Sequence, residues 1–190
     1  IESVKPYTPL EVHGRDIYIR EGCSNCHSQL VRPFRSEVVR YDPNDMEYSK
    51  AGEYVYDHPF LWGSKRTGPD LHRLGGKYPD SWHYHHMLDP TTMSPNSIMP
   101  PYEWLFYHGI DMDATAGKIK ALRTVGVPYP VGYEDTANED LLKQANEIVN
   151  NLSMDGIQVH PEGEIVALIA YLQRLGKDIK VKDETVIETE

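Results

Sequence analysis

The sequence lacks long hydrophobic runs and has few basic residues, and both shortages limit what it can do. Its longest uninterrupted apolar stretch runs only from Ile165 to Leu172, whereas a helix that spans a bilayer needs roughly 20 apolar residues. Lys and Arg number 19 against 29 Asp and Glu, which gives a net charge of −10. Because an acidic surface repels phosphates, nucleic-acid binding is disfavoured.

The composition argues against disorder and against fibrous repeats. Of the 190 residues, 39% are apolar, which is typical of a globular chain with its own core. We predict one domain over residues 1–177 and a charged tail over residues 178–190. The sequence does not begin with Met, and we expect an export signal or a membrane anchor to precede Ile1.

Cysteine is scarce, and the two cysteines stand together. Cys23 and Cys26 are separated by two residues, and His27 follows directly. Two thiols at this spacing can reach the two vinyl groups of a haem while the adjacent imidazole comes under the iron. Cys-x-x-Cys-His therefore predicts covalent attachment of one c-type haem, with His27 as an iron ligand.

Two other chemistries use paired cysteines. A thioredoxin-like redox site needs its cysteines at the end of a strand in a βαβ unit, but the flanking sequence here predicts helix. A structural zinc site needs about four ligands, and this sequence has no second cysteine pair. Both are weaker interpretations than haem attachment.

Two amphipathic helices are predicted to bracket the domain. Thr8 to Glu11 combine a capping box with proline at the first helical position, and the helix then runs to the haem motif. Near the other end, His160-Pro161-Glu162 opens a helix with an apolar stripe that Gly176 ends.

A loop between these helices offers a partner for the histidine ligand. In Thr67-Gly68-Pro69-Asp70-Leu71, the Pro69 carbonyl can accept the Nδ1 proton of His27, which makes Nε2 a better iron donor. We therefore predict Gly68 and Pro69 as part of the haem site. The alternative is an ordinary Gly-Pro turn.

The sixth iron ligand is predicted to be Met99. Pro100 and Pro101 follow it and forbid helix, so the segment is expected to form an extended loop over the distal haem face. Met93 is a weaker candidate. The imidazoles of His83, His85 and His86 could give bis-histidine ligation, but these residues are better explained as part of a helix beside the haem.

Haem propionates need hydrogen-bond donors. Candidates follow the Gly-Pro loop closely, namely Arg73, Lys77, Tyr78 and Trp82. Of these we select Arg73 and Trp82; for each, the alternative is a solvated loop side chain.

Several segments resemble the monohaem subunit of cbb3-type cytochrome c oxidase. The resemblance spans roughly residues 7–105 and is carried by residues 23–27, 29–35, 48–53, 57–71 and 75–78. Residues 57–71 are its most specific part, because Cys-x-x-Cys-His alone indicates only a class I cytochrome c.

The resemblance implies a non-catalytic electron relay. Its single haem would pass electrons from a cytochrome c donor, or from the dihaem cytochrome c subunit, to the haem b of the catalytic haem-copper subunit that reduces oxygen. The domain would face the periplasm from the bacterial inner membrane, held by an N-terminal transmembrane anchor. The resemblance also implies close packing of the two bracketing helices, with Gly14 against Tyr171 or a neighbour.

The segment from Leu30 to Arg66 is long for a loop and is predicted to be a docking face. It gathers positive charge and aromatic rings, which interface cores favour; these are Arg32, Arg35, Arg40, Lys65, Arg66, Phe34, Tyr54, Tyr56, Phe60 and Trp62. The resemblance places Ser64, Lys65 and Arg66 toward the catalytic subunit. The alternative is a subdomain that only covers the haem.

We therefore predict an all-α class I cytochrome c fold with an extended loop after the haem motif. A helical insert over about residues 106–158 precedes the last helix, with helices expected at residues 113–125 and from Thr136 to Leu152, the latter opened by a capping box. Two other functions stay open. One is an independent periplasmic electron carrier that serves another redox enzyme. The other is a haem enzyme or gas sensor, which would need an open sixth position.

Overall fold

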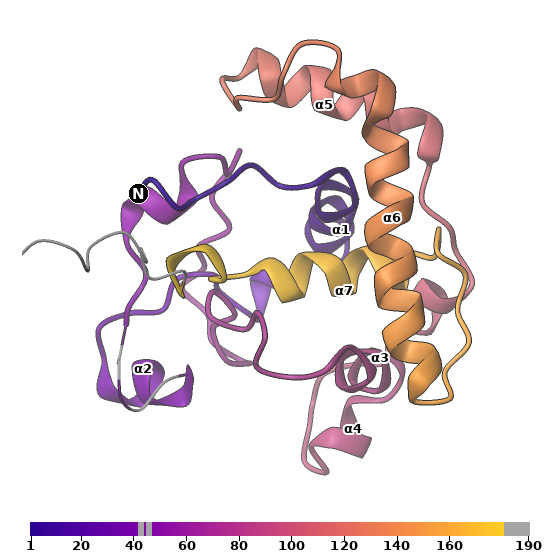
Figure 1. Cartoon of the computed structure of the whole chain (residues 1–190). Helices are drawn as coiled ribbons and strands as arrows, with labels where there is room; N and C mark the ends of the chain where they lie inside the picture. Colours follow the sequence, from indigo (N-terminus) through magenta and orange to yellow (C-terminus); the bar gives the residue numbers. More distant parts are fainter. Residues whose placement is uncertain (42–43, 45–46, 181–190) are drawn as a thin grey trace, which may run out of the picture.

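The computed structural model describes residues 1–41, 44 and 47–180, and within them every regular element is helical (Figure 1). The α-helices are α1 (Pro9–Arg20), α2 (Arg35–Tyr41), α3 (Asp80–Leu88), α4 (Pro90–Met93), α5 (Thr115–Thr124), α6 (Tyr133–Met154) and α7 (Glu164–Arg174). The 3-10 helices are η1 (Cys23–Asn25), η2 (Ala51–Tyr54), η3 (Glu103–Phe106), η4 (Met112–Ala114) and η5 (Asp178–Lys180). The described residues contain isolated β-bridges but no strand, so the predicted all-α fold is confirmed.

The first helix begins where the sequence predicts. Thr8 Oγ1 accepts the Glu11 N–H at 3.3 Å, and Glu11 Oε2 accepts the Thr8 N–H at 2.8 Å, which completes the capping box. The last helix begins at Glu164, slightly later than predicted. The reason is a turn before it, in which the Gly163 N–H bonds to the His160 carbonyl at 2.9 Å.

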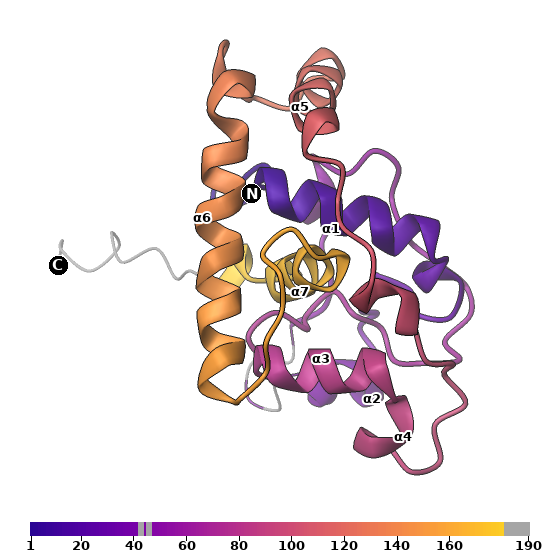
Figure 2. The same cartoon turned by 90° about the vertical axis from the view of Figure 1, so that its right-hand side faces the viewer.

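The core forms where α1 crosses α7. Figure 2 shows α7 nearly end-on beneath α1, and residues Ile165 to Leu172 of α7 are almost fully buried. A Cβ on Gly14 would lie 2.0 Å from the Ala167 carbonyl oxygen and 2.7 Å from the Tyr171 Cβ. The predicted close approach of the two helices at Gly14 is therefore confirmed, and only glycine fits there.

The insert contributes α5 and α6, and α6 lies along one side of α1 and α7 (Figures 1 and 2). Its buried positions follow the helical period, at Ala137, Leu141, Ala145, Ile148 and Leu152. The predicted capping box at Thr136 is wrong. The helix already begins at Tyr133 after Gly132, whose φ of 87° suits glycine. Thr136 lies inside the first turn, where its hydroxyl donates to the Tyr133 carbonyl.

The C-terminal end of the described chain folds back on the N-terminus. Asp178 accepts the Lys5 N–H at 2.9 Å and pairs with Arg174, so η5 is attached to the domain. The rest of the predicted tail, residues 181–190, lies outside the described residues.

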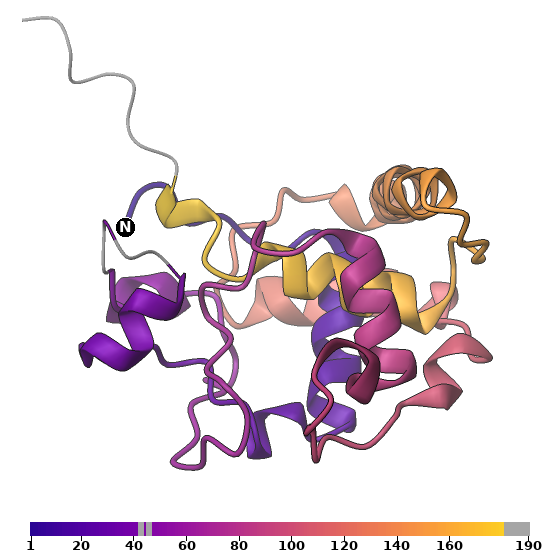
Figure 3. The ribbon, with the colours of Figure 1, turned by 90° about the horizontal axis from the view of Figure 1, so that it is seen from below.

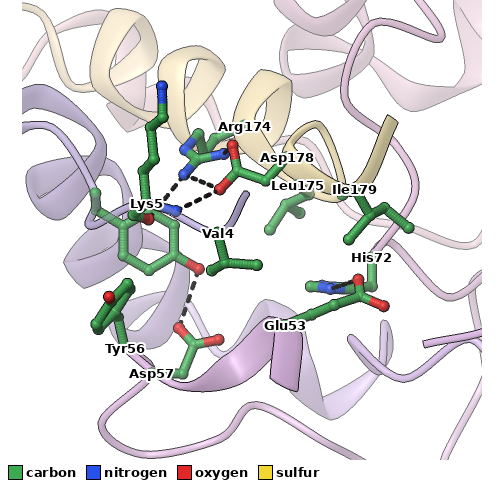
Figure 4. Close-up of a pocket in the computed structure, with 12 residues that line it drawn as sticks. Val4, Lys5, Glu53, Tyr56, Asp57, His72, Arg174, Leu175, Asp178 and Ile179 are labelled. Atoms are coloured by element: carbon green, nitrogen blue, oxygen red, sulfur yellow. Dashed lines mark hydrogen bonds and ion pairs between the residues drawn. The ribbon is translucent and has the colours of Figure 1, made fainter. Parts of the chain in front are cut away.

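A small cavity lies at this junction (Figure 4). The Tyr7 hydroxyl, which donates to Asp57 at 3.0 Å, forms part of its wall. Its volume is about 30 Å³, which holds a water molecule, whereas pockets for organic ligands start at roughly 300 Å³. This cavity is therefore not the haem site.

Candidate haem-binding site

A tight turn presents the two cysteines after α1. Gly22 takes a left-handed conformation, with φ of 69°, and turns the chain out of the helix into η1. Within the turn, the His27 and Cys26 N–H groups donate to the Cys23 carbonyl at 2.9 Å and 3.2 Å. Both thiols are free, so the turn holds two available sulfur atoms and one imidazole within five residues.

The electrostatics of this turn count against a thioredoxin-like site. Burial, helped by the charge of Glu21, raises the pKa of Cys23 to about 12, whereas redox-active cysteines have lowered pKa values. The described residues contain no βαβ unit. Zinc is disfavoured as well, because no group of three or more His, Cys, Asp or Glu side chains in the described part of the chain could hold a metal ion.

The imidazole of His27 is oriented by the predicted partner. Its Nδ1 lies 2.7 Å from the Pro69 carbonyl oxygen. Because a carbonyl can only accept, Nδ1 carries the proton, and the lone pair of the ring is on Nε2. Burial lowers the pKa of His27, so the ring is neutral near pH 7, as a metal ligand must be.

Gly68 leaves the space that this imidazole occupies. A Cβ at Gly68 would lie 2.1 Å from Cε1 of His27 and 2.6 Å from each ring nitrogen. The Gly68 N–H also donates to the Cys26 carbonyl at 3.0 Å. The loop thus bonds to the haem motif twice, through the Gly68 N–H and through the Pro69 carbonyl.

Buried hydrogen bonds connect the haem motif and the residues just after it to α1 and α7. The Tyr18 hydroxyl donates to the His27 carbonyl at 2.9 Å, and the Gln29 amide donates to the Tyr171 hydroxyl at 2.7 Å. These side chains tie the haem motif to the α1–α7 crossing. Sequence reasoning missed Tyr18 and Gln29 in this role, because their partners come from separate segments.

The segment after Met99 is tied to the end of α1 just before the haem motif. In η3, the Trp104 indole N–H donates to Glu21 at 3.1 Å. Burial raises the pKa of Tyr102, and the charges of Cys23 and Cys26 add to this effect. Met99 itself is half-buried and packs on the main core.

The histidine-rich segment forms α3, as predicted. His83 is fully buried, and neither of its ring nitrogens has a hydrogen-bond partner. His85 is exposed. His86 stacks on Trp82 at 4.6 Å, and its pKa is lowered by burial and then by the charge of His27. His86 and Trp82 therefore lie on one face of α3.

The structure gives Arg73 a partner other than a propionate. Its guanidinium donates to both Glu53 carboxylate oxygens, at 2.6 and 2.7 Å, and to the Tyr48 carbonyl at 2.9 Å. Glu53 also bonds to His72 Nε2 at 2.8 Å. Bidentate, charge-assisted hydrogen bonds of this kind are the strong ones in proteins. Arg73 thus anchors η2 to the loop before α3, and its contact with a haem propionate stays a prediction.

Neutralising Glu53 should destabilise the fold in a pH-dependent way. Burial alone would raise the pKa of Glu53, but hydrogen bonds from His72 and Arg73 outweigh it and lower the pKa from 4.5 to about 2. The ionised group therefore contributes about 3 kcal/mol above pH 4.5, which is lost as the pH falls toward 2. In urea unfolding at pH 7, the free energy of unfolding of Glu53→Gln should be lower than that of wild type by about this amount. At pH 2 to 2.5 the difference should be small.

Glu139→Gln, at an exposed position on α6, is the matched control and should leave the unfolding midpoint unchanged at both pH values. Equal midpoints for Glu53→Gln and wild type at pH 7 would contradict this account of the network.

The residues present fit a single haem. They supply two unpaired thiols, an imidazole with its Nε2 lone pair available, a glycine whose missing side chain makes room for that ring, and a methionine that packs on the same core as Cys23. Together with the all-α fold, this donor set defines a protein of the cytochrome c class.

The family follows from a comparison with protein-family models. The model described as "Cytochrome C oxidase, mono-heme subunit/FixO" matches residues 1–179. The chain therefore belongs to this family, the monohaem subunit of cbb3-type cytochrome c oxidase that the sequence resembles. A comparison with curated proteins found no match. Among the described residues, no helix has the length and hydrophobicity needed to cross a membrane.

Proposed function

We propose that this chain carries one haem bound covalently through Cys23 and Cys26, with His27 and Met99 as axial ligands, and relays single electrons within the oxidase. The observation that carries the proposal is how the His27 imidazole is held: its Nδ1 bonds to the Pro69 carbonyl, and Gly68 leaves room for the ring. Trp82, which stacks on Tyr78 and His86, is retained as a proposed haem contact.

The chain's own residues prepare this site for electron transfer. A bound haem supplies an iron that changes between the ferric and ferrous states. The Pro69 carbonyl fixes the His27 tautomer, and the thioether of Met99 would favour the ferrous state of a bound haem. If His27 and Met99 both hold the iron, no position would be left on it for a substrate, which fits a relay.

The route toward the catalytic haem-copper subunit is proposed to pass through residues 61–66. This segment lies directly against the haem motif: Gln29 N–H donates to the Leu61 carbonyl at 3.1 Å, and Gly63 N–H donates to Ser28 Oγ at 3.0 Å. Figure 3 shows the two segments next to each other. A partner that covers residues 61–66 would therefore lie close to the haem.

Exposed side chains on this segment suit a partner. Phe60 and Trp62 are exposed and stack on each other at 4.6 Å, and Ser64 and Lys65 are exposed beside them. Exposed aromatic side chains of this kind are typical of interface centres.

Two predicted docking residues have other roles. Tyr54 is buried in the core, with 1% exposed. Arg66 folds inward and donates to the Gly63 and Leu30 carbonyls, each at 3.1 Å. Arg66 therefore shapes the docking loop, which leaves Ser64 and Lys65 as the proposed contacts.

The donor is proposed to be the dihaem cytochrome c subunit or a separate cytochrome c. Thioether formation needs reduced thiols and haem on the outer side of the membrane, which favours the periplasmic side of the bacterial inner membrane. An N-terminal membrane anchor, as the family resemblance implies, would keep the domain beside the catalytic subunit.

Binding of carbon monoxide tests whether the haem iron of the proposed relay has a free coordination position. The reduced, haem-loaded protein should bind carbon monoxide poorly, because His27 and Met99 occupy both axial positions. The measurement is the Soret spectrum of the reduced protein before and after addition of the gas. Rapid and complete binding would contradict the relay and favour a haem enzyme or gas sensor.

A further inference from the structure

A second exposed surface lies where the short helix η3 meets the end of α1 (Figure 2). The Trp104 indole N–H of η3 donates to Glu21 at 3.1 Å. Just after η3, the Ile110 N–H donates to the Glu162 carbonyl at 2.9 Å, which joins this part of the chain to the segment before α7. We call this surface the η3 face, and it comprises Ile19, Arg20, Glu21, Glu103, Trp104, Tyr107, His160 and Glu162.

Large apolar side chains are exposed on the η3 face. Tyr107 is 81% exposed, Trp104 41% and Ile19 39%. Tyr107 and Glu162 also line a cleft of about 340 Å³, which is large enough to receive side chains of another protein. Exposed aromatic side chains beside a cleft are typical of a protein–protein contact.

The η3 face has one Arg and no Lys, and the charge of that Arg is already balanced. Arg20 donates to the two carboxylate oxygens of Glu164 at 2.7 and 2.6 Å. Its Nε donates to Glu21 at 2.7 Å. Because two carboxylates surround one guanidinium, this cluster adds no positive charge to the surface.

Two further carboxylates on the η3 face have no counter-charge. Glu103 and Glu162 form no ion pair within the described residues. Residues 78–117, which include η3, contain neither Lys nor Arg. The η3 face is therefore negative, and a negative surface around exposed aromatic rings attracts a basic partner.

The η3 face adjoins the start of the haem motif, because Glu21 stands two residues before Cys23. The segment 61–66 contacts the chain just after the motif, at Ser28 and Gln29. A relay needs a place where the electron arrives and another where it leaves. Since residues 61–66 are proposed to face the catalytic subunit, the η3 face is left for the donor.

We propose that the η3 face receives a separate, basic c-type cytochrome, from whose ferrous haem one electron passes to the ferric haem of this chain. The inference rests on the proposed function and deepens it. Permanent subunit interfaces are more hydrophobic, whereas charges at the rim of an interface speed the encounter of proteins that associate briefly. The uncompensated Glu103 and Glu162 therefore favour a diffusing donor over the dihaem subunit.

The test uses the ferric, haem-loaded protein and zinc-substituted mitochondrial cytochrome c, a basic protein whose excited triplet state is quenched by electron transfer. The quenching rate constant is measured at low salt and at 1 M salt. The double variant Glu103→Gln/Glu162→Gln should lower it roughly tenfold at low salt. At 1 M salt, where the screening length is about 3 Å, the variant and the wild type should be alike.

The matched control is Glu139→Gln/Glu147→Gln, which changes the net charge equally at two exposed positions of α6. Its quenching rate constant should stay close to that of wild type at both salt concentrations. Cross-linking gives a readout that does not depend on electron transfer. A carbodiimide joins a carboxylate to a neighbouring lysine, so the wild-type complex should give cross-linked peptides that contain Glu103 or Glu162.

The outcomes separate the two proposals. A wild-type chain that matures without covalent haem overturns the proposed function and this inference with it. If the wild type carries the haem but both double variants have the same rate constant at low salt, only the assignment of the η3 face is overturned. Cross-links confined to the carboxylates of α6 would overturn it as well.

Discussion

Met99→His protein should keep its covalent haem but lose the methionine-to-ferric-iron charge-transfer band. Its reduction potential should fall by a sizeable part of the roughly 0.8 V over which axial ligands tune haem potentials. The reason is that a thioether favours ferrous iron, whereas a second imidazole favours ferric iron more strongly. The measurements are the near-infrared absorption of the oxidised protein and a potentiometric titration.

Met93→His is the matched control, because Met93 is exposed at the end of α4, six positions before Met99. It should leave both the band and the potential unchanged. An unaltered spectrum and potential in Met99→His would show that another residue ligates the iron. The histidines of α3, His83, His85 and His86, would then be the first candidates.

Gly14→Ala should destabilise the fold more than any other single-methyl addition to α1. The new Cβ would lie 2.0 Å from the Ala167 carbonyl oxygen, and because that atom is backbone, α1 and α7 would have to move apart. Overpacking of a core costs about 1–3 kcal/mol, and more where backbone must shift. We expect a loss of about 3 kcal/mol in the free energy of unfolding, measured by urea denaturation.

Gly117→Ala gives the control for this experiment. Gly117 lies in α5, and a Cβ there would meet nothing within 4 Å. Since alanine favours helix over glycine by roughly 0.5–1 kcal/mol, this variant should be slightly more stable than wild type. A Gly14→Ala protein as stable as Gly117→Ala would contradict the packing of α1 on α7.

Features with a local cause could be predicted from the sequence. The capping box at Thr8 needs only neighbouring residues, and Cys-x-x-Cys-His has its chemistry within five positions. The bond from His27 to Pro69 spans 42 residues, yet it was predictable because a haem histidine needs an acceptor and the Gly-Pro loop offers one.

Features set by distant partners could not be predicted. The pattern at Thr136 fits a capping box, but Gly132 and the stacking of Tyr133 on Tyr129 favour an α6 that starts earlier. Arg73 follows the Gly-Pro loop, yet its partner Glu53 lies 20 residues away on η2. Sequence proximity indicates which donors are near the haem motif, but only the fold shows which of them are already paired.

The most direct test of the account is copurification of the oxidase with the tagged full-length protein. Membranes would be extracted in mild detergent, and haem b, copper and oxygen consumption would be measured in the purified fraction. The account predicts all three together with the c-type haem of this chain. A protein that comes away alone, with only its c-type haem, would contradict a relay within the oxidase and would instead indicate an independent electron carrier.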